Sequence, residues 1–263
     1  MTRTDAIRLR RFLTTSLFLC FGMASTVTLS ASQVFERAWY GRYPLPVGGS
    51  VAVENIQGEI GVEGWDRGEV EVTAAKIGRG RGDHLDDVRV VAELGLQSLK
   101  IRTVYPPRLD EPVRVNYRLR VPRQVRLAWL RTLEGNISVH EIEGSVDART
   151  LSGNIEQTDV TGRVVARTLT GSVLVSLRAL PARTAPLLLD TVNGNIVLLL
   201  PPRPNADLEL STVAGTIEGD YAFEVSSTPG DSTRRARLGL GGVTISLRTV
   251  RGSIRVAQRS DQL

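Results

Sequence analysis

Charged side chains that recur at a fixed interval are the residues of this sequence best placed to do chemistry. The phrases RTLEGNI, RTLSGNI and RTLTGSV begin 18 positions apart, which puts Arg131, Arg149 and Arg167 in one phase. Glu141 and Asp159 share a second phase at the same interval. If each interval is one circuit of a coil, the two carboxylates lie about 5 Å apart, as in retaining glycosidases. The three guanidinium groups then form a row suited to the carboxylates or phosphates of a polymer.

Both sets also have a purely structural interpretation. Exposed acids commonly balance nearby arginines, here Arg149 and Arg167, and no third catalytic group or aromatic platform accompanies Glu141 and Asp159. We therefore predict no catalytic residue and expect that the chain is not an enzyme. Arg131, Arg149 and Arg167 are kept as a candidate surface binding stripe.

Ligands for metals and cofactors are scarce. His84 and His140 are the only histidines and lie far apart in sequence, and the single cysteine, Cys20, lies near the N-terminus. Neither Lys76 nor Lys100 follows the glycine run of a phosphate-binding loop. The glycine- and aspartate-rich nonapeptide of calcium-binding β-rolls is also missing. The sequence predicts no metal site and no cofactor.

Residues 1–32 have the order of a secretory signal peptide: a basic head, the apolar stretch FLTTSLFLCFGMASTVTL and then small residues. We expect export to the periplasm or cell surface, followed by cleavage. An uncleaved leader would be the only membrane attachment, although its Thr and Ser content makes it a poor permanent span. The chain has 33 basic and 28 acidic residues, and removal of the leader leaves 29 and 27. Such a small net charge gives no support to a nucleic-acid partner.

A glycine-centred motif repeats through the second half of the chain. It consists of Thr, an aliphatic residue, any residue, Gly, a small polar residue and an aliphatic residue, as in TLEGNI, TLSGNI, TLTGSV, TVNGNI, TVAGTI and TVRGSI. The phrases EIEGSV and DVTGRV fall between the first copies, so that glycines there recur every nine residues. This regularity indicates a repeat architecture with a tight turn in each unit.

Nine extended residues span about 30 Å, so 18 residues make a circuit of two strands. We predict an all-β chain and, more specifically, a parallel β-solenoid of β-helix or β-roll type. Leu133, Ile137 and Val139, with Leu151 and Ile155 in the next circuit, are expected to face the interior. The motif threonines are expected to stack in chain order: Thr132, Thr150, Thr168, Thr191, Thr212 and Thr249.

Upstream of the repeats the chain is also strand-like but less regular. The segment VRVNYRLRV alternates strictly, with apolar residues on one face and arginine and asparagine on the other, which predicts a strand with one wet face. The predicted parts are a signal peptide (1–32), an N-terminal β region and cap (33–129), the solenoid repeats (130–258) and a polar tail (259–263).

These motifs together resemble the bacterial putative-adhesin family of β-strand-repeat domains. The resemblance rests on NIQGEIGVEGWD, VNYRLRVP, IVLLLPP and TVRGSIRV beside the repeats, and it covers roughly Val47 to Val256. It implies a secreted or cell-envelope β-solenoid and supplies no catalytic or binding residues.

We accordingly expect a non-enzymatic exported protein with adhesin-like binding or scaffolding, its partner being an envelope polymer or a surface protein. Two alternatives stay open. One is a polysaccharide-active enzyme on a β-helix, and the other is a structural protein that self-assembles through the ends of the stack.

Overall fold

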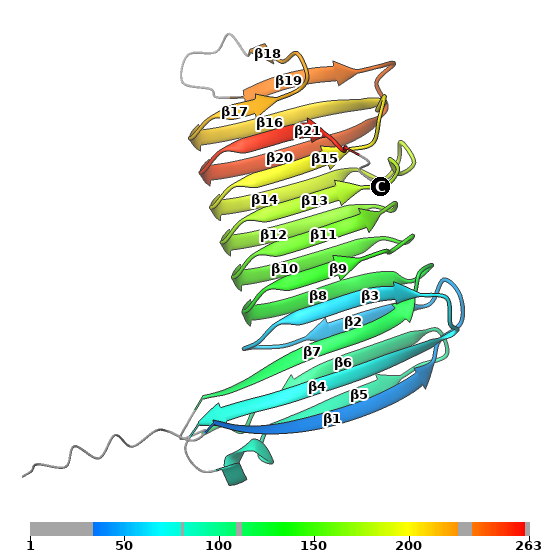
Figure 1. Ribbon diagram of the computed structural model, residues 1–263, viewed down its shortest axis with the longest axis vertical. Helices are drawn as coiled ribbons and strands as arrows, with labels where there is room; N and C mark the ends of the chain where they lie inside the picture. The colour runs from blue at the N-terminus through cyan, green and yellow to red at the C-terminus, as the bar shows by residue number, and fades with distance from the viewer. Residues whose placement is uncertain (1–33, 80–81, 109–111, 226–232, 261–263) are drawn as a thin grey trace, which may run out of the picture. The chain divides into compact units, whose positions relative to one another are not determined.

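The structure, a computed structural model, describes residues 34–79, 82–108, 112–225 and 233–260, and nearly all regular elements in these ranges are β-strands (Figure 1). The exception is a short 3-10 helix, η1 (Gly82–Leu85). The strands form two large sheets, here called sheet A and sheet B. The prediction of an all-β chain is confirmed. The predicted signal peptide lies outside the described residues.

Sheet A has ten strands. In spatial order they are β1 (Val34–Pro44), β4 (Glu69–Arg79), β7 (Val113–Pro122), β3 (Ile60–Trp65), β9 (Ile137–His140), β11 (Ile155–Val160), β13 (Val173–Leu177), β15 (Ile196–Leu200), β21 (Ile254–Gln258) and β17 (Ile217–Gly219).

Sheet B has eleven strands. In spatial order they are β18 (Glu224–Val225), β19 (Thr233–Leu238), β16 (Ala206–Ala214), β20 (Val243–Arg251), β14 (Leu187–Asn193), β12 (Val164–Thr170), β10 (Val146–Ser152), β8 (Arg126–Glu134), β2 (Ser50–Glu54), β6 (Ser98–Val104) and β5 (Arg89–Leu94).

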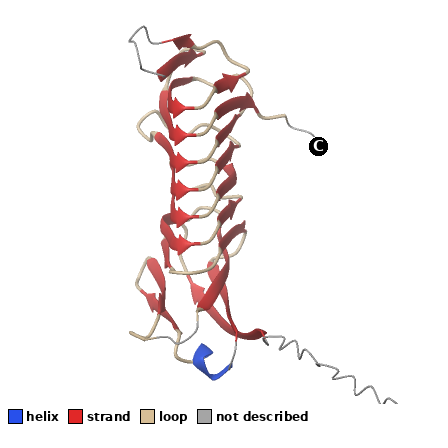
Figure 2. Cartoon of the chain, turned by 90° about the vertical axis from the view of Figure 1, so that its left-hand side faces the viewer, coloured by secondary structure: helices blue, strands red, loops and turns tan. Residues whose placement is uncertain are grey.

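The repeated segments alternate between the two sheets. A strand of sheet B and the next strand of sheet A form one layer, here called a rung, and the rungs β8–β9, β10–β11, β12–β13 and β14–β15 stack in chain order (Figure 2). Neighbouring rungs pair in parallel, and Thr150 lies in register with both Thr132 and Thr168. The interval of 18 residues in the sequence is thus the length of one rung.

The expectation of a parallel solenoid is met only in part, because both sheets are mixed. In sheet A, β1 and β4 pair antiparallel, as do β4 and β7. In sheet B, β5 is antiparallel to β6, and β19 is antiparallel to β16 and β18. Neither sheet closes on itself, since each has two edge strands. The antiparallel strands cover parallel strands that would otherwise stand unpaired at the ends of the stack.

The rungs leave chain order at both ends of the stack. The rung β20–β21 lies between β14–β15 and β16–β17, and the rung β2–β3 lies between β6–β7 and β8–β9. Thr249 therefore follows Thr191 in space, and Thr212 comes last. The predicted chain order of these threonines was wrong, because a repeat period fixes the shape of a rung but not its place in the stack.

The core lies between the two sheets and follows strand alternation. In β10, Val146 and Ala148 are buried between the sheets, whereas Asp147 and Arg149 lie on the outward face. The wet and dry faces predicted for VRVNYRLRV are confirmed in β7, where Val113, Val115, Tyr117, Leu119 and Val121 are buried.

One predicted part of the interior is wrong. Leu133 and Leu151 are 51% and 50% exposed, although Ile137 and Ile155 are buried as expected. The reason is that Thr132 and its counterparts point inward, so the next residue must point outward. The aliphatic residues after the motif threonines instead form an exposed ridge: Leu133, Leu151, Leu169, Val192, Val250 and Val213.

Glycine is required where the turns of successive rungs stack. Gly153 has φ of 151°, a conformation that residues with a side chain rarely adopt. A Cβ atom there would stand 2.1 Å from the carbonyl oxygen of Gly135 in the preceding rung. The same approach recurs at Gly135, Gly171, Gly194 and Gly252. The fixed glycine of the motif therefore sets how closely rungs can approach.

The motif threonines hold the same turns from inside. Thr150 Oγ1 donates a hydrogen bond to the Gly135 carbonyl oxygen (3.1 Å), and Thr168 Oγ1 donates to that of Gly153 (3.0 Å). Each hydroxyl thus satisfies a backbone acceptor of the preceding rung that lies beside the core.

Thr150→Val keeps the shape of the side chain and removes this donor. We expect a loss of about 1–2 kcal/mol in the free energy of unfolding, because the Gly135 carbonyl loses its side-chain donor. Thr170→Val, at an exposed position of β12, is the matched control and should stay within about 0.5 kcal/mol of wild type. Urea denaturation measures both, and equal losses in the two variants would contradict this role.

The N-terminal region contributes rungs to the same two sheets as the repeats. The boundary predicted at residue 129 falls inside β8 (Arg126–Glu134). Both β2–β3 and β6–β7 come from residues before this boundary. The rung β2–β3 pairs in parallel with the repeat rung β8–β9, and β6–β7 pairs in parallel with β2–β3. The division into parts stays a prediction.

Candidate functional site

The predicted arginine stripe lies on the outward face of sheet B. Arg149 is in register with Arg131 on β8 and with Arg167 on β12. Arg149 Nε and Nη2 donate to the two carboxylate oxygens of Asp147, both at 2.8 Å, and this contact raises the pKa of Arg149. Arg167 Nε donates to Asp190 at 2.9 Å. Two of the three guanidinium groups are thus already bound by carboxylates of the chain.

Arg131 differs from its two neighbours. Its guanidinium carbon lies 5.7 Å from the centre of the Trp129 ring, and no carboxylate of the described residues pairs with it. A cation over an indole face is held by the ring quadrupole. The binding role of the stripe stays a prediction.

Glu141 follows β9, and Asp159 lies near the end of β11 where the register with β13 shifts. Both have left-handed backbone, with φ of 57° and 58°. Glu141 forms an ion pair with Arg123. Asp159 Oδ1 accepts from Arg259 at 2.6 Å and lies 3.8 Å from Arg178. The expectation that they balance the arginines of sheet B was wrong, because those arginines pair with acids on their own face. The ion pairs with arginines hold both of these left-handed residues in place.

The two histidines belong to different elements. His140 is on β9, where Nδ1 contacts Thr158 Oγ1, and His84 is in η1. Within the described ranges, no three His, Cys, Asp or Glu side chains gather as metal ligands would. In the same ranges, none of the helical segments has the length and apolar character needed to cross a bilayer.

A groove of about 630 Å³ opens on the outward face of sheet A and is here called the outer groove. Its lining residues come from β1, β4, β7 and the following strands of the same sheet. Small residues make its floor: Ala75 on β4, Gly61 on β3 and Ser138 on β9. Gly61 lies in register between Arg118 and Ser138, so a position without a side chain lies at the centre of the groove.

Polar groups surround this floor. Arg118, Glu36 and Glu156 project from three different strands, and Asn116 and Asn136 lie between them. These offer hydrogen-bond donors and acceptors side by side, the chemistry needed to bind a chain of hydroxyl and carboxylate groups.

The amide groups of the groove are held in fixed positions. Asn116 Oδ1 accepts from the backbone N–H of Glu59 (3.0 Å), and Asn136 Oδ1 accepts from that of Asn154 (2.9 Å). Beneath them the Tyr117 hydroxyl lies 2.7 Å from Thr103 Oγ1, and burial raises the pKa of Tyr117. The tyrosine therefore stays neutral in the core, and the groups that face solvent are preorganised by backbone contacts.

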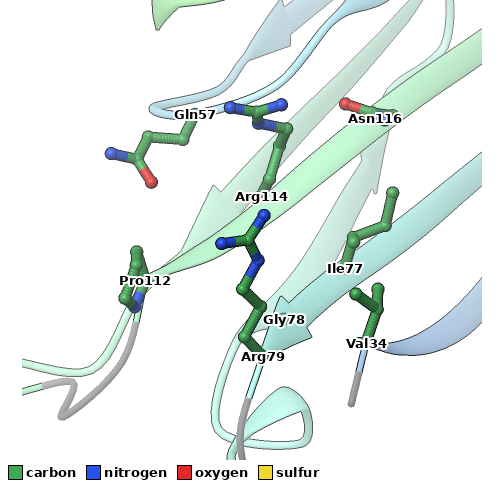
Figure 3. Close-up of a pocket in the computed structure, with 8 residues that line it drawn as sticks. All are labelled: Val34, Gln57, Ile77, Gly78, Arg79, Pro112, Arg114 and Asn116. Carbon is green, nitrogen blue, oxygen red and sulfur yellow. The ribbon is translucent and has the colours of Figure 1, made fainter. Parts of the chain in front are cut away.

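A second cavity of about 420 Å³ adjoins the outer groove and shares Ile77 and Asn116 with it (Figure 3). Arg79 on β4 and Arg114 on β7 extend into this opening, with Gln57 on another side. The two cavities together follow β4 and β7 across the outward face. An extended ligand could therefore contact both.

Arginine pairing distinguishes this surface from Arg149 and Arg167 of sheet B, although not from Arg131. Within the described chain, Arg79, Arg114 and Arg118 have no carboxylate within ion-pair distance. Arg120, the next outward residue of β7, is instead engaged by Glu63 (3.6 Å) and Glu71 (4.0 Å). Guanidinium groups without an internal partner are the ones available to an external anion.

The outer groove was not predicted from the sequence. The one sequence feature that pointed to it is the solvent-exposed face of VRVNYRLRV, which carries Arg114, Asn116 and Arg118. Gly61 and Glu36 lie on distant segments, and only the insertion of β2–β3 into the stack brings Gly61 beside Arg118.

No family model and no curated protein matches this chain. Solved structures similar to it include a putative cell adhesion protein from Clostridium sporogenes, with 10% identity, 86% of this chain and 100% of that chain covered, and a TM-score of 0.46. A putative adhesin from Bacteroides fragilis shows 10% identity over 85% and 97%, with a TM-score of 0.41. A putative lipid binding protein from Parabacteroides distasonis shows 11% identity over 85% and 97%, with a TM-score of 0.27.

The first two of these names agree with the family that the sequence resembles, and two further solved structures similar to this chain are also called putative adhesins. At these identities and TM-scores, no ligand, partner or activity is carried over to this chain.

Proposed function

We propose that this chain is an exported, non-enzymatic β-solenoid that binds an acidic polysaccharide of a cell envelope or surface along its outer groove. The signal-peptide pattern of residues 1–32 supports export, and the stacked parallel rungs support the solenoid description. Binding of this kind would be adhesin-like, because it would attach the protein to a polymer without chemically altering the polymer.

The observation that carries the proposal is the contrast between Arg118 and two of the three arginines of the predicted stripe; the third, Arg131, lies against Trp129. Arg149 and Arg167 on sheet B are occupied by Asp147 and Asp190, whereas Arg118 in the outer groove has no such partner among the described residues. An acidic sugar brings a carboxylate that a guanidinium group can bind through two hydrogen bonds. Its hydroxyl groups can donate to carboxylates such as Glu156.

The extended form of the site also favours a polymer. The outer groove and the adjoining cavity share Asn116, and they place Arg118 on the same strand face as Arg114. Arg114 and Arg118 are four residues apart, with Asn116 between them, which is about 13 Å along the strand. A polymer long enough to span several sugar units can therefore contact both arginines.

Arg118→Ala tests the proposal with polygalacturonate, a polymer of uronic acids, and with neutral dextran for comparison. We expect binding of polygalacturonate by the wild type and at least about a tenfold weaker affinity in the variant, since a charge-assisted pair is lost. Isothermal titration calorimetry at low salt measures both affinities. Chromatography of the incubated polymer should show no shortened chains.

Two matched variants make the result specific. Arg120→Ala changes the same face of β7 at a residue already paired with Glu63, and its affinity should stay close to wild type. Arg167→Ala reports on the sheet B stripe and should also bind normally. Loss of binding in Arg167→Ala but not in Arg118→Ala would move the site to sheet B. Failure of the wild type to bind any acidic polymer, or release of shortened chains, would overturn the proposal.

A further inference from the structure

β1 (Val34–Pro44) is an edge strand with a long unpaired side. Among the strands of the described residues it pairs only with β4, in an antiparallel register that runs its whole length, and it is the last strand of sheet A (Figure 1). The backbone N–H and C=O groups on its other side are therefore open to pairing with another strand. Natural edges are blocked by proline, by bulges and by charged side chains, including charges that point inward. β1 carries Glu36, Arg37 and Arg42, but its only proline, Pro44, is the final residue.

We infer that two copies of this chain pair through β1, antiparallel and centred on Trp39, into a closed two-fold dimer. In this register every residue of β1 has a partner, because Trp39 is the middle residue of the strand. Glu36 of one copy lies opposite Arg42 of the other, and the symmetry produces this pair twice. Opposite charges directly across an antiparallel pair stabilise it, and like charges destabilise it.

The outward face of β1 suits this pairing. Glu36 has no ion-pair partner within the described part of the chain. Arg42 donates to Glu71 (2.9 Å), and hydrogen bonds from Tyr40 and Arg42 lower the pKa of Glu71. Glu71 therefore stays ionised and holds Arg42 at the strand edge, and Glu69 lies 3.7 Å from Arg42 Nε. Arg42 keeps these two carboxylates, and Glu36 of the second copy would share its remaining N–H donors. Ala38, opposite Tyr40 of the second copy, leaves room for its ring.

The inward face is also complementary to itself. Phe35 and Tyr43 face each other across the two copies, and Trp39 faces its own counterpart. All three are only partly buried in one copy while packing against the core. Arg37, which forms an ion pair with Asp86, lies opposite Gly41, over which the Trp39 and Tyr43 rings pack. Aromatic cross-strand pairs are among the most stabilising in antiparallel sheets.

The dimer would also change the binding surface. A two-fold axis through an antiparallel strand pair is perpendicular to the sheet, so both outer grooves lie on the same side of one continuous sheet. Glu36 lines the outer groove, so each groove reaches the junction, one on either side of the two-fold axis. The assembly is closed at two copies, which distinguishes it from a filament that grows through both ends of the stack.

Sedimentation velocity over a range of concentrations tests the inference on protein expressed with its own leader and purified after export. We expect a monomer–dimer equilibrium for wild type. Glu36→Arg places like charges at both symmetry-related pairs and should weaken association about tenfold or more. The double variant E36R/R42E restores opposite charges across each pair and should recover at least part of the association.

A control and the contrary results complete the test. Glu218→Arg makes the same charge change on β17, at the other end of sheet A, and should dimerise like wild type. Circular dichroism confirms that all variants remain folded. A wild type that stays monomeric, larger open-ended assemblies, or dimers of E36R as tight as wild type would each overturn the inference. If the wild type is strictly monomeric but still binds the polymer, the dimer inference fails and the proposed function stands.

Discussion

Gly153→Ala should destabilise the fold by more than about 3 kcal/mol. The new Cβ would stand 2.1 Å from the carbonyl oxygen of Gly135 and 2.5 Å from its carbonyl carbon. Both are backbone atoms of the neighbouring rung, so relief requires the rungs to separate and lose parallel hydrogen bonds. The backbone φ of 151° adds strain for any residue with a side chain.

Gly68→Ala is the matched control, because a Cβ there meets no atom within 4 Å. Its stability should change by less than about 0.5 kcal/mol. The midpoint of urea unfolding, followed by circular dichroism, compares the two variants with wild type. A Gly153→Ala protein as stable as Gly68→Ala would mean that the turns of successive rungs do not stack as described.

Gln157→Leu should stabilise the protein by about 1–3 kcal/mol. Gln157 is fully buried between the sheets, in register with Val139 and Val175. Among the residues that the structure describes, none forms a hydrogen bond with its amide nitrogen or oxygen. A buried polar group without a partner costs free energy, and a side chain of similar size without polar atoms removes that cost.

The exposed Gln97→Leu serves as control, since no desolvation is relieved there and a change below about 0.5 kcal/mol is expected. Thermal unfolding at fixed pH and protein concentration measures both variants. A Gln157→Leu protein with a lowered melting temperature would show that the amide has partners inside the stack.

The fold class and the rung length could be predicted from the sequence because both are local. A glycine at a fixed place in each unit predicts the turn, and alternate apolar residues such as Ile137 and Val139 predict the inward face. The exposed Leu133 was assigned to the wrong side because the alternation of inward and outward residues does not continue through the turn between β8 and β9. Leu133 therefore does not share a face with Ile137, four residues later. The inward Thr132, with its hydrogen bond to the Gly58 carbonyl oxygen, decides the phase.

The order of rungs and the outer groove could not be predicted, because both depend on contacts between distant segments. Gly61 and Ser138 lie side by side only because β3 inserts between β7 and β9. The energy that favours this order comes from pairing and packing of whole strands, and no residue type marks it. The pairing of Arg149 with Asp147 could not be predicted either, because the position of an arginine in the repeat does not indicate which acid will pair with it.

The central claim is that distant strands stack in this order and so build the surface that binds. Disulfide trapping tests it directly, with Cys20→Ser in the background to remove the one native cysteine. Gly61→Cys with Ser138→Cys should oxidise readily, because these residues are direct partners on adjacent parallel strands. Arg118→Cys with Ser138→Cys should remain reduced, because β3 lies between their strands. The opposite pattern would place β7 beside β9, dismantle the outer groove and contradict the account.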